Sequence, residues 1–311
     1  MHLTKIFRRK NISGIKRQAG AALIVVVIFI VVIAALTVGI CAINFTTFMN
    51  QVAAQKAAKL LYLSESGARI VVSEYKAALL AGGTTAANDV LTELHGQIFV
   101  LPDDKGKITL STYAYWFRAV LPYPVGTTTI TVCLPGDVPP AEADGEAGIT
   151  FPDDGMLILK KEGQPEEKAD YATASIGSFN ATGSGTPVTF VLKQSFTNDI
   201  EPGDEFYIGC VYDSTEVSVN QGDDLTIDLE NEDWPIVFPP EKGTIFIISS
   251  NVSYLYCYDA RIVNGTEVTF TNVRRVEGAQ ADFPLTVGGG KPTEIYIGKS
   301  IAVRTVPEYG H

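Results

Sequence analysis

The chain has 311 residues, a formal net charge of −11 and an apolar fraction of 46%, so it is long enough for one large domain or several small ones. An acidic chain without a basic stripe does not suit a nucleic-acid-binding protein, because nothing in it would displace counterions from phosphates. Four cysteines without a C-x-x-C pair or a Cys/His cluster exclude a cysteine-stapled scaffold and argue against a structural zinc site.

The positive charge gathers at the N-terminus. Six basic residues and no acidic residue precede a long uncharged stretch, namely Lys5, Arg8, Arg9, Lys10, Lys16 and Arg17. Without these six cations the net charge falls from −11 to −17, so the remainder of the chain is strongly acidic. Such a body suits a soluble domain outside the membrane.

Residues 21–43 read AALIVVVIFIVVIAALTVGICAI; they begin at Ala21, include Leu23 and Val25, end at Ile43 and carry no charge. As a helix these 23 residues are about 35 Å long, enough to cross a hydrocarbon core of about 30 Å. The basic flank predicts a single pass of the bacterial inner membrane, with the N-terminus in the cytoplasm and the body extracytoplasmic.

Other kinds of targeting segment fit the N-terminus less well. The apolar run is too long for a cleaved secretory signal, and no A-x-A site follows it. The bulky Ile40 directly before Cys41 excludes a lipoprotein signal. A plain signal anchor remains an alternative.

The helix-forming sequence does not stop at the end of the apolar run. Phe45 to Leu80 favours helix, and no proline or glycine pair occurs before Gly82-Gly83. The pattern predicts one helix over 21–83, about 60 residues and about 90 Å long, with a membrane half and an amphipathic half. The amphipathic half has one apolar stripe at spacings of three and four: Leu60, Leu63, Gly67, Val71, Tyr75 and Ala78.

This layout resembles that of type IV pilins, in which a basic leader ends in glycine and an apolar helix follows at once. The stretch KRQAGAALIVVVIFIVVIAALTVGI is similar to the class III signal of minor pilins of the PilX-like group. Residues 57–69, AAKLLYLSESGAR, resemble the "YLAE-small-Gly" segment common in that group. The resemblance covers residues 5–80 and implies a leader of residues 1–20, cut by a prepilin peptidase between Gly20 and Ala21, with Ala21 then N-methylated.

One position departs from the pattern of major pilins. They carry glutamate at the fifth mature position, which is Val25 here. In the family that carboxylate neutralises the N-terminal amine of a neighbouring subunit inside the apolar filament core, where an unpaired charge is costly. Its absence argues against a major subunit and fits minor pilins and the tip pseudopilin of type II secretion systems.

The body after Gly83 has a different pattern, and the predicted fold class is α+β. Thr85–Leu94 suggests a short helix, and from Ile98 onward an all-β region of β-sandwich type is expected. We expect a pilin-like β region at 84–134 and a Pro-rich, acidic linker at 135–148. The candidate strands are Ile108–Leu121, Thr127–Leu134, Met156–Lys160, Val188–Lys193, Phe206–Val211, Ile245–Ser249, Val252–Tyr258, Val268–Val273 and Ile295–Val303.

Four short motifs recur in the same order beyond that linker. Residues 151–159 parallel 238–247, 171–176 parallel 258–263, 185–190 parallel 265–270 and 205–209 parallel 294–298, at offsets of 80 to 89. The repeat predicts two related β modules, at 149–235 and 236–311. Cys210 and Cys257 fall at non-equivalent positions in the two copies, so a shared disulfide is unsupported and the pairing of Cys133, Cys210 and Cys257 stays open.

No catalytic or metal site stands out in the body. The segment 213–233 holds eight carboxylates, and Asp223, Asp224 and Asp228 are the candidate calcium ligands, but the spacing matches no EF-hand and a solvated surface is the better interpretation. There is no G-x-S-x-G motif, and His95 is the sole histidine within the body. The aromatic run Tyr113, Tyr115, Trp116 and Phe117 suggests sheet packing.

The sequence therefore leads to the hypothesis of a minor pilin, not an enzyme and without metal or cofactor. Its expected partners are other pilin subunits, the inner-membrane assembly platform, a prepilin peptidase and the membrane, with no nucleic acid. The alternatives are a tip pseudopilin of a type II secretion system and a signal-anchored extracytoplasmic ligand-binding β protein.

Overall fold

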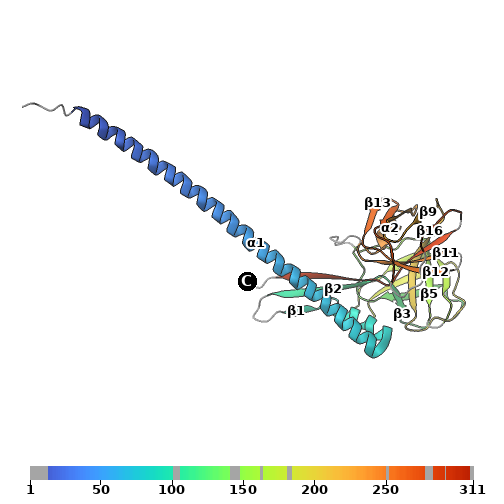
Figure 1. Cartoon of the computed structure of the whole chain (residues 1–311). Coiled ribbons are helices and arrows are strands. Elements are labelled where there is room, and N and C mark those ends of the chain that lie inside the picture. The colour runs from blue at the N-terminus through green and yellow to red at the C-terminus, as the bar shows by residue number, and fades with distance from the viewer. Residues whose placement is uncertain are drawn as a thin grey trace, which may run out of the picture. The chain divides into compact units, whose positions relative to one another are not determined.

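The computed structural model describes residues 13–100, 106–140, 148–161, 164–180, 184–249, 252–276, 283–290 and 292–308, with side chains described from residue 24 onward. The chain divides into two compact units, Met1–Tyr62 and Leu63–His311. In Figure 1 the helix α1 runs from blue to cyan, and the labelled strands of the body follow in green, yellow and red.

Helix α1, Ser13–Leu94, is broken once, at Gly83. The φ of Gly83 is 72° and its ψ is −162°, a conformation that a residue with a Cβ rarely adopts. The predicted end of the long helix at the glycine pair and the short helix after it are thereby confirmed.

The end of α1 packs on a three-stranded sheet with the strand order β1-β2-β18. Its strands are β1 (Ile98–Val100), β2 (Lys107–Ala114) and β18 (Ile301–Glu308). The helix face against this sheet is the predicted apolar stripe: Gly67 and Val71 are buried and Leu63, Tyr75 and Ala78 are half-buried. The predicted amphipathic half is confirmed.

Six strands form a closed barrel, in the order β8-β3-β4-β7-β6-β5 with β5 returning to β8. Closure corrects the expected sandwich: β8 pairs with both β3 and β5, so the six strands form one closed sheet instead of two facing ones. The bounds are β3 (Phe117–Ala119), β4 (Thr129–Leu134), β5 (Gly155–Lys160), β6 (Glu167–Ile176), β7 (Thr186–Leu192) and β8 (Glu205–Tyr212).

The same large sheet continues from β8 through β17, β11, β12 and β15. A second sheet has the order β10-β14-β13, and β16 pairs with β9. The bounds are β9 (Val217–Val219), β10 (Leu225–Asp228), α2 (Asp233–Val237), β11 (Thr244–Ser249), β12 (Val252–Cys257), β13 (Arg261–Asn264), β14 (Glu267–Phe270), β15 (Arg274–Arg275), β16 (Leu285–Val287) and β17 (Thr293–Ile297).

Strand pairing in the second half repeats that in the first, residue for residue. The β5–β8 pair corresponds to β11–β17, the β4–β7 pair to β10–β14, and the β6–β7 pair to β13–β14. The equivalent facing residues, first copy and then second, are Leu157–Ile208 and Ile245–Ile297, Ile130–Phe190 and Leu225–Phe270, and Ala174–Phe190 and Arg261–Phe270. The motifs seen in the sequence therefore mark one arrangement of strands that occurs twice.

A buried tyrosine locks the same turn in each copy. The Tyr171 hydroxyl donates to the Pro152 carbonyl at 2.9 Å, and the Tyr258 hydroxyl donates to the Pro239 carbonyl at 2.7 Å. Both rings are at most 1% exposed. A glycine after each turn leaves room for the ring, because an added Cβ there would lie within 2.3 Å of the hydroxyl oxygen. The two copies share this fold detail as well as the motif.

These pairings extend the repeat toward the N-terminus. Strands β3 and β4 precede the predicted linker at 135–148, yet both belong to the barrel. The start of that segment is tied into the body, since the Gly136 N–H donates to the Thr92 hydroxyl at 3.2 Å and Thr186 donates to the Gly136 carbonyl. Strand β8 serves both copies, because it pairs with β5 along one edge and, along the other edge, first with β3 and then with β17. The units of strand pairing thus cross the expected boundaries at 149–235 and 236–311.

Two of the predicted strands are each divided into two observed strands, and the two breaks lie next to each other. The segment 108–121 separates into β2 and β3 at Tyr115-Trp116, and the segment 295–303 separates into β17 and β18. At these breaks the chain passes between the barrel sheet and the sheet under α1, and the Tyr115 N–H donates to the Ser300 carbonyl at 3.1 Å. Each of the other candidate strands overlaps an observed strand.

Candidate functional site

The unit Met1–Tyr62 presents apolar surface with no cover. Every side chain from Ile24 to Met49 is exposed, and none of them is charged. Val25 is 63% exposed and Ile43 is 67% exposed, on a helix that is apolar on all sides. The helix is long and apolar enough to cross a membrane, by its length and composition. An apolar surface of this kind is covered in nature by lipid or by other apolar helices.

The few hydroxyl groups of this segment are paired within the helix. Thr37, Thr46 and Thr47 each donate to the main-chain carbonyl four residues earlier, at 2.8 to 2.9 Å. A hydroxyl group satisfied in this way needs no water. The stretch from Ile24 to Ile43 is therefore compatible with a hydrocarbon environment.

The positions predicted for leader cleavage and methylation lie near the N-terminal end of α1. Gly20 and Ala21 have helical main chain, while their side chains and that of Leu23 lie outside the described residues. The predicted cleavage between Gly20 and Ala21 and the methylation of Ala21 stay predictions. The residues of α1 that contact β2, β3 and β18 come later in the sequence, from Ser64 onward.

At Gly67 the helix α1 closely approaches β2 and β18. A Cβ at Gly67 would lie 2.6 Å from Thr305 Cγ2 and 2.9 Å from Leu110 Cδ2, so only glycine lets the helix come this close to β2 and β18. One turn earlier, the Ser64 and Thr305 hydroxyls lie 2.5 Å apart in a hydrogen bond. The glycine of the "YLAE-small-Gly" resemblance thus has a local packing reason in this chain.

Beyond Gly83 the short helical end of α1 is held to β2 and β3 by polar bonds. Arg118 is 5% exposed, and its guanidinium lies 2.5 Å from the Asp89 carboxylate. The Thr112 hydroxyl donates to the Leu91 carbonyl at 2.5 Å. Because a buried cation without its partner is costly, Asp89 fixes the helix end over β3.

His95 follows this helix end and has a structural set of contacts. Its Nδ1 lies 3.1 Å and 3.2 Å from the main-chain oxygen and nitrogen of Thr112, and its ring packs on Phe179 with 4.5 Å between centroids. The Asp137 carboxylate is 3.7 Å from Nε2. No nucleophile that could pair with His95 for catalysis is among these contacts. Of the aromatic run, Tyr115, Trp116 and Phe117 are buried, as predicted for packing residues.

The candidate calcium ligands close turns instead of converging. Asp223 accepts from Asn220, Asp224 accepts from the Asn272 main chain and Asp228 accepts from the Glu230 main chain. A hydrogen bond from the Thr266 side chain, and then the Glu230 main chain, lowers the pKa of Asp228. Within the described ranges no group of three His, Cys, Asp or Glu side chains is placed to hold a metal ion.

The cysteine thiols of the body are separate. Cys133 and Cys210 are buried, Cys257 is partly exposed, and all are free. Burial raises the pKa of Cys210 to about 12 and also raises that of Cys133, where Arg118 partly opposes it. These two buried thiols are therefore protonated and unreactive at neutral pH.

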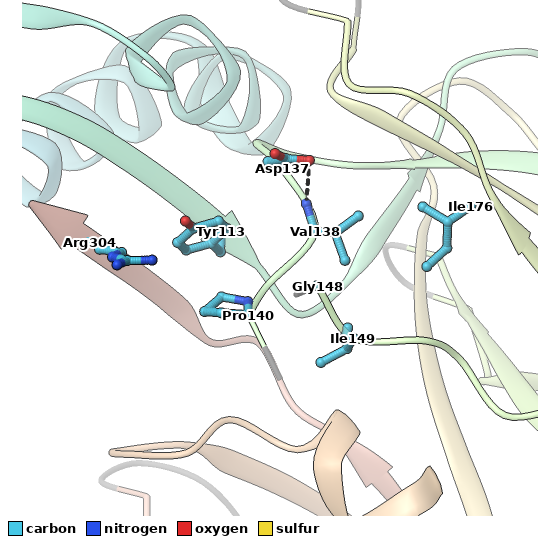
Figure 2. A pocket seen from close by; sticks show the side chains of 8 residues that line it. All are labelled: Tyr113, Asp137, Val138, Pro140, Gly148, Ile149, Ile176 and Arg304. Carbon is cyan, nitrogen blue, oxygen red and sulfur yellow. Dashed lines mark hydrogen bonds between the residues drawn. The ribbon is translucent and has the colours of Figure 1, made fainter. Parts of the chain in front are cut away.

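Two adjoining cavities open beside β2 and β18. The first, of about 350 Å³, is lined by eight residues that Figure 2 shows as sticks, with Tyr113 on β2 and Arg304 on β18 on one side and Ile149 and Ile176 on the other. Asp137 accepts from the Val138 main chain at 2.7 Å in its wall. The second cavity, of about 340 Å³, shares Tyr113, Pro140 and Arg304 with the first. Sequence reasoning had not singled out Arg304, because the lining comes together only through the β2–β18 pairing.

No protein-family model matches the chain, and no curated protein matches it either. Among solved structures, the chain is similar to one from the "VP16-VP17 complex, a complex of the two major capsid proteins of bacteriophage P23-77", with 12% identity, coverage of 68% of this chain and 90% of that chain, and a TM-score of 0.15. A likeness at that TM-score carries no argument about fold or function.

Proposed function

We propose that this chain is a minor pilin, a membrane-anchored subunit that takes part in assembling a type IV pilus. The observation that carries the proposal is the segment 24–49, which is predominantly apolar, free of charge and wholly exposed. It directly follows the Gly20-Ala21 layout of a prepilin leader. A stable single-pass anchor alone needs no such leader, so the two features together favour a pilin.

In this proposal the apolar helix first holds the protein in the inner membrane. After the leader is removed, the helix leaves lipid and packs beside the helices of neighbouring subunits, where van der Waals contacts replace lipid contacts. The body stays outside the helical core. Its own helical part, from Leu63 to Leu94, is fixed to β2 and β18 at Gly67 and to β3 by the Arg118–Asp89 pair.

The residue at position 25 favours a minor subunit over a major one. Val25 has no carboxylate to pair with the N-terminal amine of a neighbour, and it is 63% exposed. Because a filament core made wholly of such subunits would hold unpaired amines, this chain is placed among subunits that carry the glutamate. The same observation fits the tip pseudopilin of a type II secretion system, which is the second candidate.

The mature N-terminus tests the proposal. Mass spectrometry of the protein from cells with and without prepilin peptidase is expected to find a methylated Ala21 only where the peptidase is present. An intact leader in both strains contradicts the proposal and leaves a signal-anchored extracytoplasmic protein. With processing shown, deletion of the gene separates the two candidates, because loss of pili indicates a minor pilin and loss of secretion indicates a pseudopilin.

A further inference from the structure

The second cavity beside β18 is a groove with a main-chain wall. Five consecutive residues, 300–304, line it together with Tyr113, Tyr115 and the turn at Pro239–Lys242. Successive side chains of a strand point to opposite sides, so a run of consecutive lining residues means that the main chain itself faces the groove. The groove is therefore bounded by peptide groups on one side and by prolines on the other.

That main chain belongs to an edge strand. The strand order β1-β2-β18 leaves β18 paired with β2 alone among the described residues. Natural edge strands are commonly protected by charge or proline. Here Arg304, Pro307 and Glu308 protect the second half of β18, whereas Ile301, Ala302 and Val303 leave the first half without such protection.

Two cations at this groove have no anionic partner in the part of the chain that the structure describes. They are Lys242, at the turn, and Arg304, on β18; both are exposed, and the one acidic lining residue is Glu241. The rest of the chain outside the leader region is strongly acidic. An acidic ligand would therefore be attracted here and repelled elsewhere.

The repeat supplies an internal comparison for Lys242. Its equivalent in the first copy is Asp154; both have a positive φ, 48° and 57°, and both precede the glycine that leaves room for the tyrosine ring. Asp154 is paired with Lys193 at 2.8 Å. The register of the repeat places Val273 at the position equivalent to Lys193. The second copy thus has a basic residue where the first has an acidic one, and Lys242 makes no ion pair among the described residues.

Tyr115 adds an aromatic ring to the same wall. The residue is 4% exposed, and its hydroxyl oxygen is buried without a hydrogen-bond partner. The hydroxyl is too deeply buried to meet a ligand in the groove, so it is the ring of Tyr115 that shapes the wall. Tyr115 lines the groove between β2 and the turn at Pro239–Lys242.

We propose that this groove binds an extended acidic peptide as an added β-strand along Ile301–Val303. The free main-chain groups of β18 would hydrogen-bond to the peptide backbone, which is the usual mode of strand addition. Lys242 and Arg304 pair with its carboxylates. The inference is independent of the pilin proposal, because it uses only the body.

The test uses the full chain in detergent micelles and fluorescence anisotropy with labelled octapeptides of alternating glutamate and valine. We expect binding that weakens at least about tenfold when glutamine replaces glutamate, and a similar loss when alternate peptide nitrogens are methylated. The variant that combines Lys242→Gln with Arg304→Gln should lose about tenfold or more.

Arg275→Gln is the matched control, because it removes an exposed cation from the edge strand β15, away from the groove residues. Its binding should equal that of the parent chain. Equal binding of the glutamine peptide, or unchanged binding by the double variant, would overturn the acidic specificity. Equal binding of the N-methylated peptide, or displacement of the peptide by glucuronic-acid oligosaccharides at lower concentration, would overturn strand addition and point to a glycan site. The mature N-terminus of the protein bears on neither outcome.

Discussion

Large apolar side chains are exposed in the segment 24–49 and buried in the body from Leu63 onward. In the body, large side chains such as Trp116, Phe117 and Phe206 are completely buried. In the segment, Ile24, Phe29 and Phe48 are each more than 60% exposed. A chain that can build a dense core but leaves one helix bare has a use for that helix outside its own fold. The difference separates the part that is stable by itself from the part that needs a lipid or protein partner.

Two glycines of α1 give the largest expected contrast between these regions. Replacing Gly67 with leucine forces the helix away from Thr305 and Leu110, and we expect the free energy of unfolding to fall by about 2 to 4 kcal/mol. Gly39 has no heavy atom within 4 Å of an added Cβ, so Gly39→Leu should leave the body unchanged. Denaturant unfolding in detergent, followed by fluorescence of the two buried tryptophans, Trp116 and Trp234, measures both. Equal losses in the two variants would break the comparison.

Within the body, the two copies of the repeat should respond alike. Tyr171→Phe and Tyr258→Phe each remove a hydroxyl that donates to a buried proline carbonyl, and each should lower the free energy of unfolding by about 1 to 2 kcal/mol. Thermal unfolding of the two single variants and of the double variant measures the effects. If one of the two single variants unfolds at the same temperature as the parent chain, the two copies share a strand register but do not depend equally on this hydrogen bond.

The hydroxyl pair beside Gly67 should have a smaller effect. Ser64→Ala leaves the Thr305 hydroxyl without its partner, and the expected loss is about 0.5 to 1 kcal/mol. Ser73→Ala, at an exposed position of the same helix, is the matched control and should be neutral. If chemical denaturation finds no difference between the two variants, the Ser64–Thr305 bond does not help to hold the helix.

Thiol chemistry distinguishes the regions without changing stability. Since burial raises the pKa of Cys210 to about 12, its thiol should stay unmodified by maleimide at pH 8 until the body unfolds. The partly exposed Cys257 should react in the folded protein, whereas Cys41 lies in the apolar segment that detergent covers. The sign of the pH effect follows: above the ordinary thiol pKa the unfolded chain loses a proton that the folded chain keeps, so stability falls as pH rises. Peptide mapping that finds Cys210 modified first would contradict the buried position.

The helix was predictable from sequence because its signals are local. Spacings of three and four placed the stripe through Gly67 and Val71, and the pair Gly82-Gly83 marked the break. The β motifs likewise revealed that strands recur. The sequence motifs did not reveal that the first copy begins before residue 149, because the offset between equivalent residues changes from 95 for Ile130 and Leu225 to 80 for Phe190 and Phe270.

The candidate sites depended on long-range contacts that no local pattern shows. The groove unites Tyr115 with Arg304, which are far apart in the sequence and adjoin only because β18 returns to pair with β2. The unpaired state of Lys242 becomes meaningful only once the register makes Asp154 its equivalent. Sequence reasoning found the segments that fold by themselves and missed the places where distant segments meet.

Photo-crosslinking from the bare helix tests the central claim most directly. A benzophenone amino acid would replace Phe29, which is 65% exposed, and in a control chain Ile262 of the body, which is 57% exposed. In filaments sheared from cells, we predict that position 29 crosslinks to the N-terminal helices of other pilin subunits, while position 262 gives no such product. The pilin proposal would be contradicted if position 29 crosslinked only to lipid in every fraction and the protein were not found in sheared filaments.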